Sequence, residues 1–293
     1  MQQTNMKLEK ERDLGEIITD TFSFLRINYK PLYQVFVSTI LPIMLLFVAA
    51  NAYYQYATQE ITTNTLFLNN DPFGLFKNLS SILIPTILAL LTSLFFYVIS
   101  SIAILGSVKS YQQTGEIDVE FVKAEIKSRF WSMTGLVLLS FIVLVLGLMI
   151  CIVPFFYLIV PVTMMFPILI FENKNVGDSF SDAFNLIKEN FWPTLGTIIV
   201  VFLIIMFASG IFQIPIILYS LFSMVTQLEA SYENLDNLVK VDWVLIGLSA
   251  IGTFGSNILS LVSIISWALI YFNLNEKHNL TGTVQEIDSI GGN

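Results

Sequence analysis

Long apolar runs separated by short polar stretches dominate the chain. A run of about 20 apolar residues is enough to cross the hydrocarbon core of a bilayer as a helix. Six such spans are predicted, and none of them contains Asp, Glu, Lys, Arg or His. They are residues 33–54, 82–106, 132–152, 154–171, 195–224 and 243–272, with a hairpin expected near Pro154. The pattern predicts an all-α integral membrane protein with six transmembrane helices.

The distribution of lysine and arginine predicts how these spans are oriented. If successive spans alternate in direction, only Lys77 and Lys240 fall on one side of the membrane, and the other twelve of the 14 basic residues share the opposite side. Loops that are rich in Lys and Arg lie in the cytoplasm. We therefore expect both ends of the chain in the cytoplasm, and this split also supports an even number of spans.

Two segments, residues 13–33 and 175–195, match at an offset of 162. Each is expected to form an amphipathic helix that opens with a capping-box-like pair, Asp13 with Glu16 and Asn175 with Asp178. Each ends in Asn-aromatic-x-Pro, where a membrane helix begins, because proline is tolerated in the first turn of a helix. The identical pairs are Gly15/Gly177, Asp20/Asp182, Phe22/Phe184, Asn28/Asn190 and Pro31/Pro193.

Each amphipathic segment has a predicted apolar face. A weaker third copy is expected at residues 118–131, so that an amphipathic helix plus two spans would occur three times in parallel repeats. The faces are Leu14, Ile17, Ile18, Phe22 and Leu25 in the first copy, and Val176, Phe180, Ala183, Phe184, Ile187 and Phe191 in the second. The three helices are expected to form either a collar packed at the membrane interface or a docking surface for a cytoplasmic partner.

The expected organisation is a single membrane domain, residues 1–293. It divides into a polar tail (1–12), repeats at 13–110, 115–174 and 175–275, and a second tail (276–293). The polar, mixed-charge N-terminus does not resemble a cleavable signal peptide. The net charge of −8 argues against nucleic acid as a partner.

Residues with catalytic potential are few. The single histidine, His278, is expected to be solvated, and the single cysteine, Cys151, has no nearby base that could activate it. Glu172 is expected to end the fourth span, with ligand binding as the alternative. We therefore predict no catalytic, cofactor-binding or metal-binding residues.

The last two spans carry the most polar side chains predicted at membrane depth. Gly252, Ser256 and Ser260 recur at every fourth residue, a spacing that lets helices approach closely. Asn257 and Gln213 are the most polar of these groups. We expect them to support helix packing, and the alternative is the wall of a polar cavity.

Several of these residues resemble a known family, the membrane domain that is attached to some bacterial glycerophosphoryl diester phosphodiesterases and also occurs alone. The matching residues are Pro154, Tyr157, Pro161, Pro167, Glu172, Gly177, Ala183, Phe184, Lys188, Asn190, Phe191 and Trp192. The tail, from Tyr271-Phe272-Asn273-Leu274 through Glu276-Lys277 to Gly282, Ile287, Ile290 and Gly291, resembles stand-alone relatives common in Bacteroidetes. The resemblance implies six spans and the bacterial cytoplasmic (inner) membrane, and it implies no defined activity.

Three functions remain open. The first is a non-enzymatic scaffold or accessory subunit of a membrane complex, with the lipid bilayer and other membrane or cytoplasmic proteins as partners. The second is a transporter or lipid-handling protein without ion-coupling residues. The third, a membrane-embedded enzyme, has the least support, because no catalytic pair is found at depth.

Overall fold

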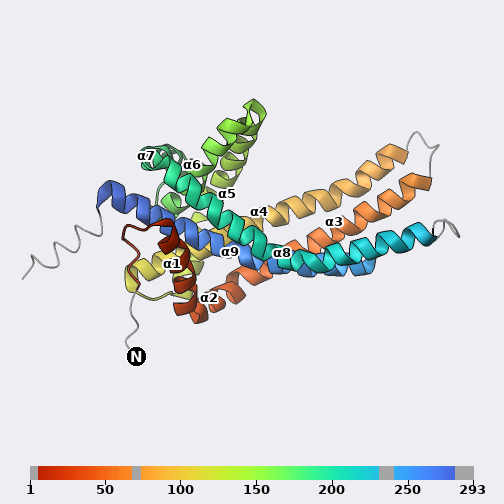
Figure 1. The fold of residues 1–293 in the computed structure, drawn as a ribbon, viewed down its shortest axis with the longest axis horizontal. Coiled ribbons are helices and arrows are strands. Elements are labelled where there is room, and N and C mark those ends of the chain that lie inside the picture. Colours follow the sequence, from red (N-terminus) through yellow and green to blue (C-terminus); the bar gives the residue numbers. More distant parts are fainter. Residues whose placement is uncertain (1–5, 68–73, 231–240, 281–293) are drawn as a thin grey trace, which may run out of the picture. The chain divides into compact units, whose positions relative to one another are not determined.

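The computed structural model describes residues 6–67, 74–230 and 241–280, and every regular element in them is a helix (Figure 1). In chain order the elements are α1 (Leu14–Ile27), α2 (Tyr29–Val35), the π-helix η1 (Phe36–Ile40), α3 (Leu41–Phe67), α4 (Gly74–Thr114), α5 (Val119–Ile150), α6 (Ile152–Phe171), α7 (Val176–Ile187), α8 (Phe191–Ala230) and α9 (Trp243–Asn279).

Six helical stretches in the described residues are long and apolar enough to cross a membrane, which confirms the predicted count. They are Tyr29–Glu60, Ser81–Thr114, Val119–Ile150, Ile152–Phe171, Phe191–Val225 and Trp243–Asn279. The first stretch consists of α2, η1 and most of α3. At 1.5 Å per residue, the 41 residues of α4 span about 60 Å, whereas the hydrocarbon core is only about 30 Å thick. The longest helices therefore extend beyond the apolar layer.

The hairpin between α5 and α6 lies at Cys151, three residues before the predicted break at Pro154. Cys151 is extended (φ −175°, ψ 161°), and its N–H donates to the carbonyl of Gly147. Pro154 instead occupies the first turn of α6, where a missing N–H is harmless. Gly147 allows the two helices to meet closely, because a Cβ at this position would lie 2.6 Å from Cδ1 of Leu158.

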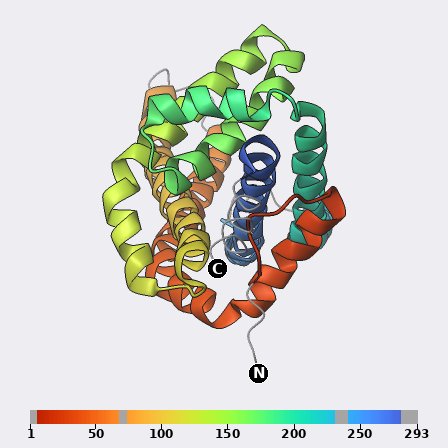
Figure 2. The ribbon, with the colours of Figure 1, turned by 90° about the vertical axis from the view of Figure 1, so that its left-hand side faces the viewer.

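The chain forms two compact units, and the boundary between them falls within α4, α8 and α9. Unit 1 contains residues Met1–Ile40, Tyr97–Ile205 and Leu261–Asn293. Segments of α4, α6 and α9 contribute many of its fully buried side chains. Figure 2 shows the C-terminal part of α9 (blue) among the other helices of this unit. The fully buried side chains of these segments include Ile102 and Leu105 of α4, Met164 and Ile168 of α6, and Phe272 of α9.

Unit 2 contains residues Leu41–Phe96 and Met206–Ser260. Aromatic contacts join its helices: Phe47 stacks on Phe96 with centroids 5.2 Å apart, and Tyr56 stacks on Trp243 at 5.4 Å. Large apolar side chains such as Ile84 and Phe207 are exposed. Exposed apolar surface on this scale would be a liability in water, but it suits contact with lipid.

Close packing of α8 on α9 depends on two glycines. A Cβ at Gly255 would lie 2.3 Å from Cδ1 of Phe212, and a Cβ at Gly252 would lie 2.8 Å from Cδ1 of Ile216. Neither distance is compatible with a real side chain unless the facing residue moves. The face of α9 that carries these two glycines therefore packs directly against α8.

We expect Gly255→Ala to destabilise the protein by about 1–3 kcal/mol, the usual range for overpacking. Gly247→Ala is the matched control, since a Cβ there meets nothing within 4 Å and alanine favours a helix. Thermal unfolding in detergent measures both. Equal midpoints for the two variants would show that α8 and α9 do not pack closely at this point.

Candidate functional site

Charged side chains gather where α1, α5 and α7 meet the ends of α4, α6 and α9. We call this region the polar end of unit 1, and it is defined by Arg12, Asp20, Lys109, Glu125, Glu172, Lys174 and Asp182. It includes the segment of residues 6–12 that precedes α1.

The cap that begins α1 fixes the first side of this site. The Asp13 carboxylate accepts a hydrogen bond from the Glu16 N–H at 2.7 Å, and the Glu16 carboxylate accepts one from the Asp13 N–H at 3.0 Å. This reciprocal pair confirms the predicted capping box of α1. At the start of α7, Asn175 Oδ1 accepts from the Asp178 N–H at 2.9 Å, and the Asn175 amide donates to the Asp178 carboxylate. The second helix is thus capped from the predicted position by a related arrangement.

A cation directly before each of these helices reaches an aspartate on its second turn. Arg12 Nε lies 2.8 Å from Asp20 Oδ2, and Lys174 Nζ lies 2.7 Å from Asp182 Oδ2. Both pairs are eight residues apart, and Arg12 and Lys174 are themselves separated by 162. Both aspartates were predicted site residues, but their cations lie one residue outside the matched segments.

Arg12 also fastens the segment of residues 6–12 to the helices. Its side chain is fully buried, and its guanidinium donates to the carbonyls of Lys7, Leu8 and Lys10. Its backbone N–H donates to Asn273 Oδ1 of α9 at 2.8 Å. A buried guanidinium must be paired and hydrogen-bonded, so Arg12 holds this segment against both α1 and α9.

These contacts shift pKa values at the polar end. Burial works to raise the pKa of Asp20, but hydrogen bonds from Arg12 and Lys10 outweigh it, and the pKa falls below the ordinary value. Hydrogen bonds to Asp182 and Glu172 raise the pKa of Lys174. The ion pairs of Asp20 therefore stabilise the fold at pH values above 3.8, its ordinary pKa, and this stabilisation is lost as the pH falls below that value. The Lys174 contribution is present below 10.5 and is lost as the pH rises through its elevated pKa.

Lys109 joins three segments of unit 1. Its buried ammonium donates to Glu125 Oε1 of α5 at 2.8 Å and to Asn173 Oδ1, after α6, at 2.7 Å. Arg129 donates to the same Asn173 oxygen at 2.6 Å. Asn173 adopts the left-handed conformation (φ 55°), which asparagine tolerates better than most residues. Lys109 thus fixes α5 and the α6–α7 link to α4.

Glu172 does more than end the apolar run. Its carboxylate pairs with Lys174 and accepts a hydrogen bond from the Tyr271 hydroxyl of α9 at 2.9 Å. The tail residues Tyr271 and Asn273 therefore both bind the polar end, whereas the matched tail positions 282–291 lie outside the described residues. His278 is exposed and contacts its neighbour Asn279.

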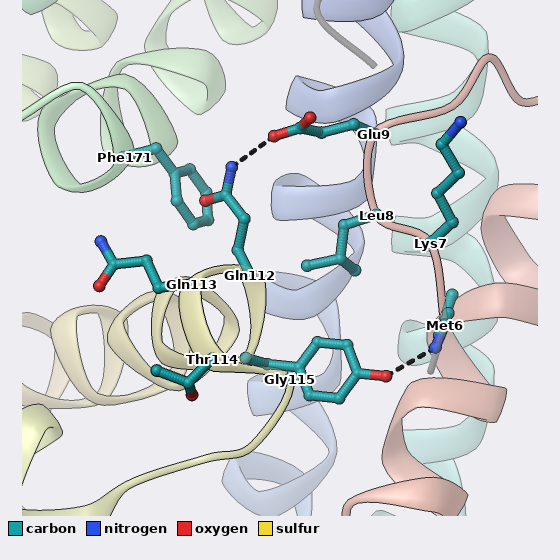
Figure 3. A pocket seen from close by; sticks show the side chains of 10 residues that line it. Met6, Lys7, Leu8, Glu9, Gln112, Gln113, Thr114, Gly115 and Phe171 are labelled. Carbon is teal, nitrogen blue, oxygen red and sulfur yellow. Dashed lines mark hydrogen bonds between the residues drawn. The ribbon is translucent and has the colours of Figure 1, made fainter. Parts of the chain in front are cut away.

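A cavity of about 590 Å³ opens beside residues 6–9 (Figure 3). Its walls come from this segment, from Tyr111–Gly115 at the end of α4, and from Phe171. The Met6 N–H donates to the Tyr111 hydroxyl at 2.7 Å, and the Gln112 amide donates to Glu9 at 2.7 Å. In the part of the chain that the structure describes, no group of three or more His, Cys, Asp or Glu side chains could hold a metal ion.

The remaining paired residues lie at both ends of the two short helices. Gly15 and Gly177 lie next to the cap oxygens. A Cβ at Gly15 would lie 3.4 Å from Asp13 Oδ1, and a Cβ at Gly177 would lie 3.6 Å from Asn175 Oδ1. Asn28 and Asn190 lie at the breaks, where their carbonyls accept from the N–H groups of Leu32 at 3.0 Å and Thr194 at 3.1 Å. Pro31 and Pro193 are each the third residue of the following helix, α2 and α8, so both prolines lie in a first helical turn as expected, and the helices begin four residues before the predicted spans.

The predicted apolar faces of the short helices are wrong in part. α1 buries Ile17, Thr21 and Phe24, and leaves Phe22 49% exposed. α7 buries Ser179, Ala183 and Ile187. Phe184 is half-buried and lies between the rings of Phe180 and Tyr157. Apolar side chains can face either lipid or protein, so the sequence alone does not show which face of a short helix packs inward.

The middle copy also differs from the other two. Asp118 caps α5 by accepting from the Glu120 N–H at 2.9 Å, but α5 then continues unbroken to Ile150. This segment has no Asn-aromatic-x-Pro sequence, so nothing stops the helix before its span.

The polar residues predicted in the last two spans lie in unit 2 and bond mainly within α9. Ser256 donates to the Gly252 carbonyl at 2.8 Å, Asn257 to Thr253 at 2.7 Å, and Ser260 to Asn257 at 2.7 Å. The Gln213 amide nitrogen faces α9, where it would lie 3.7 Å from a Cβ at Gly252. These contacts favour helix packing over a polar cavity wall.

Sequence reasoning missed Arg12, Lys109, Asn173 and Lys174. Extending the two matched segments by one residue towards the N-terminus would have found Arg12 and Lys174. The place of Lys109 in an otherwise apolar stretch of α4 was the available signal for a buried cation. Comparison with protein-family models, curated proteins and solved structures found no match.

We expect Arg12→Ala to free residues 6–11, because it leaves Asp20 without its buried partner. Asp20 keeps its contact with Lys10 at 3.0 Å, so the expected cost is that of the lost charged hydrogen bonds, about 1.5–3 kcal/mol. Since proteolysis follows the population of the open state, cleavage by trypsin after Lys7 and Lys10 should rise by roughly tenfold or more.

Lys123→Ala is the control, because it removes an exposed pair with Glu120 on α5. Exposed pairs contribute about 0–1 kcal/mol, so cleavage near the N-terminus should not change. Equal cleavage of the wild type and Arg12→Ala would contradict the role assigned to Arg12.

Proposed function

We propose that the chain is a non-enzymatic multi-pass protein of the bacterial cytoplasmic membrane that serves as a scaffold or accessory subunit of a membrane complex. The observation that carries this proposal is the mutual pairing of acids and bases at the polar end. Arg12–Asp20, Lys109–Glu125 and Lys174–Asp182 all meet within 2.7–2.8 Å. Side chains whose charges and hydrogen-bonding groups are taken up by one another are suited to holding helices together.

A three-repeat organisation is part of the proposal. Matching caps, ion pairs and helix starts in α1–α2 and α7–α8 support two of the copies. The cap of α5 supports the third more weakly. The resemblance to the phosphodiesterase-linked membrane domain belongs to the same proposal, since its motif residues Glu172, Tyr271 and Asn273 lie in the polar end.

We further propose that this end faces the cytoplasm. Arg12, Lys109, Arg129 and Lys174 gather there, as expected for the positive side of a membrane protein. The two basic residues predicted on the opposite side, Lys77 and Lys240, have side chains outside the described residues.

The outward sides of α1 and α7 are the proposed docking surface. Arg26 and Lys188 are exposed and occupy equivalent positions in the two helices. Asp20 and Asp182 are unsuitable for testing this surface, because reversing either charge would first break an internal pair. Arg26 and Lys188 have no such role in the described structure.

The test is gentle detergent extraction of the tagged native protein, followed by mass spectrometry of what co-purifies. We expect a stoichiometric protein partner that is lost in Arg26→Glu/Lys188→Glu and retained in the control Lys123→Glu. A partner retained by all variants would remove the docking surface from α1 and α7. Extraction without any partner would contradict the scaffold proposal.

The cavities of unit 1 favour a second candidate, lipid handling. A volume of about 590 Å³ lies within the range of small-molecule sites. One lipid enriched in the extracted sample, without a protein partner, would move the assignment to this candidate.

A further inference from the structure

A second cavity of unit 1 lies at the junction of α1 and α2. We call it the interfacial cavity. Its volume is about 420 Å³, and it is lined by Ile27–Pro31 and by Tyr111 and Gly115–Ile117. The Tyr111 ring meets Phe24 edge-on, with centroids 5.2 Å apart, and its hydroxyl is fixed by the Met6 N–H. Both contacts hold the Tyr111 ring in place on this wall.

Two of the helical stretches that are long and apolar enough to cross a membrane begin or end beside the interfacial cavity. Tyr29 begins the first span, and Thr114, next to Gly115, ends the second. Tyr29 and Tyr33 are 60% and 67% exposed, and aromatic residues of this kind gather at headgroup level. Four residues apart, they lie on one helix face, and the exposed Val37 follows them into the span. An apolar strip thus leads from the cavity towards the hydrocarbon region.

Two opposite charges line this cavity, and neither side chain forms an ion pair with another described residue. The Lys30 ammonium lies 5.9 Å from the centroid of the Tyr29 ring and forms no ion pair with a described carboxylate. Glu116 bonds only through its backbone in the described residues: its carbonyl accepts from Ser110 at 3.0 Å and from Thr114 at 2.9 Å. The polar end differs, because there such charges meet within 3 Å. A cavity lined by a cation and an anion that have no ionic partner in the described part of the chain complements a zwitterion.

We propose that the interfacial cavity binds the headgroup of a phospholipid that carries a primary amine. The lipid phosphate pairs with Lys30, and its ammonium donates hydrogen bonds to the Glu116 carboxylate. A choline headgroup has no N–H and cannot make the second contact. The acyl chains follow Tyr33 and Val37 into the bilayer. This site is independent of the scaffold proposal, and it requires only that the chain resides in a membrane.

The experiment measures lipid binding to the full chain in detergent by native mass spectrometry. The probes are phosphatidylethanolamine, phosphatidylglycerol and free phosphoethanolamine. Hydrogen bonds to charged groups contribute enough for about a tenfold change in affinity. We expect Lys30→Ala and Glu116→Ala each to weaken binding of phosphatidylethanolamine by about tenfold, and phosphatidylglycerol to bind more weakly and without sensitivity to Glu116→Ala.

Glu120→Ala and Lys123→Ala are the matched controls, since they remove an exposed pair of the same charges outside this cavity. All four side chains are exposed, so the variants should keep the thermal stability of the wild type. Equal binding of the two lipids, or unchanged binding in either cavity variant, would overturn the proposal. Free phosphoethanolamine binding as tightly as the lipid would assign the site to a soluble ligand instead.

Discussion

Burial of two cations, Arg12 and Lys109, is the constraint on which the polar end of unit 1 depends. A cation removed from water must find a carboxylate and further hydrogen-bond acceptors. Arg12 finds them in Asp20 and in three carbonyls of its own segment. Lys109 finds them in Glu125 and Asn173. Lys109 therefore joins segments that are distant in sequence, whereas Arg12 fixes residues 6–12 to the nearby helix α1.

The start of α7 repeats the solution found at the start of α1. In each, a cap fixes the first turn, a preceding cation reaches an aspartate on the second turn, and an asparagine stands at the break before a span. The copies differ in burial, because Arg12 is enclosed whereas the Lys174 side chain is 35% exposed. Water screens the second pair more, so Arg12 is expected to contribute more to stability.

Those parts of the fold that depend on interactions within one helix could be predicted from the sequence. The apolar runs predicted six spans, and the Asp13–Glu16 spacing predicted a cap, because each depends on a single helix. The inward face of α1 could not be predicted, since the apolar Phe22 is 49% exposed while the polar Thr21 is buried and lies 3.1 Å from the Ser266 hydroxyl of α9. Pro154 could not locate the hairpin, because a helix accepts proline in its first turn. The partners of Arg12 and Lys109 required tertiary structure.

We propose a membrane bundle whose internally paired end faces the cytoplasm. The single cysteine allows a direct test, because Cys151 is exposed at the hairpin between α5 and α6. Labelling with a membrane-impermeant maleimide should modify Cys151 in intact cells. The exposed Ser128 of α5, changed to cysteine in a Cys151→Ser background, should react only after permeabilisation. The reverse pattern would contradict the orientation, and labelling of both positions in intact cells would contradict a membrane-spanning α5.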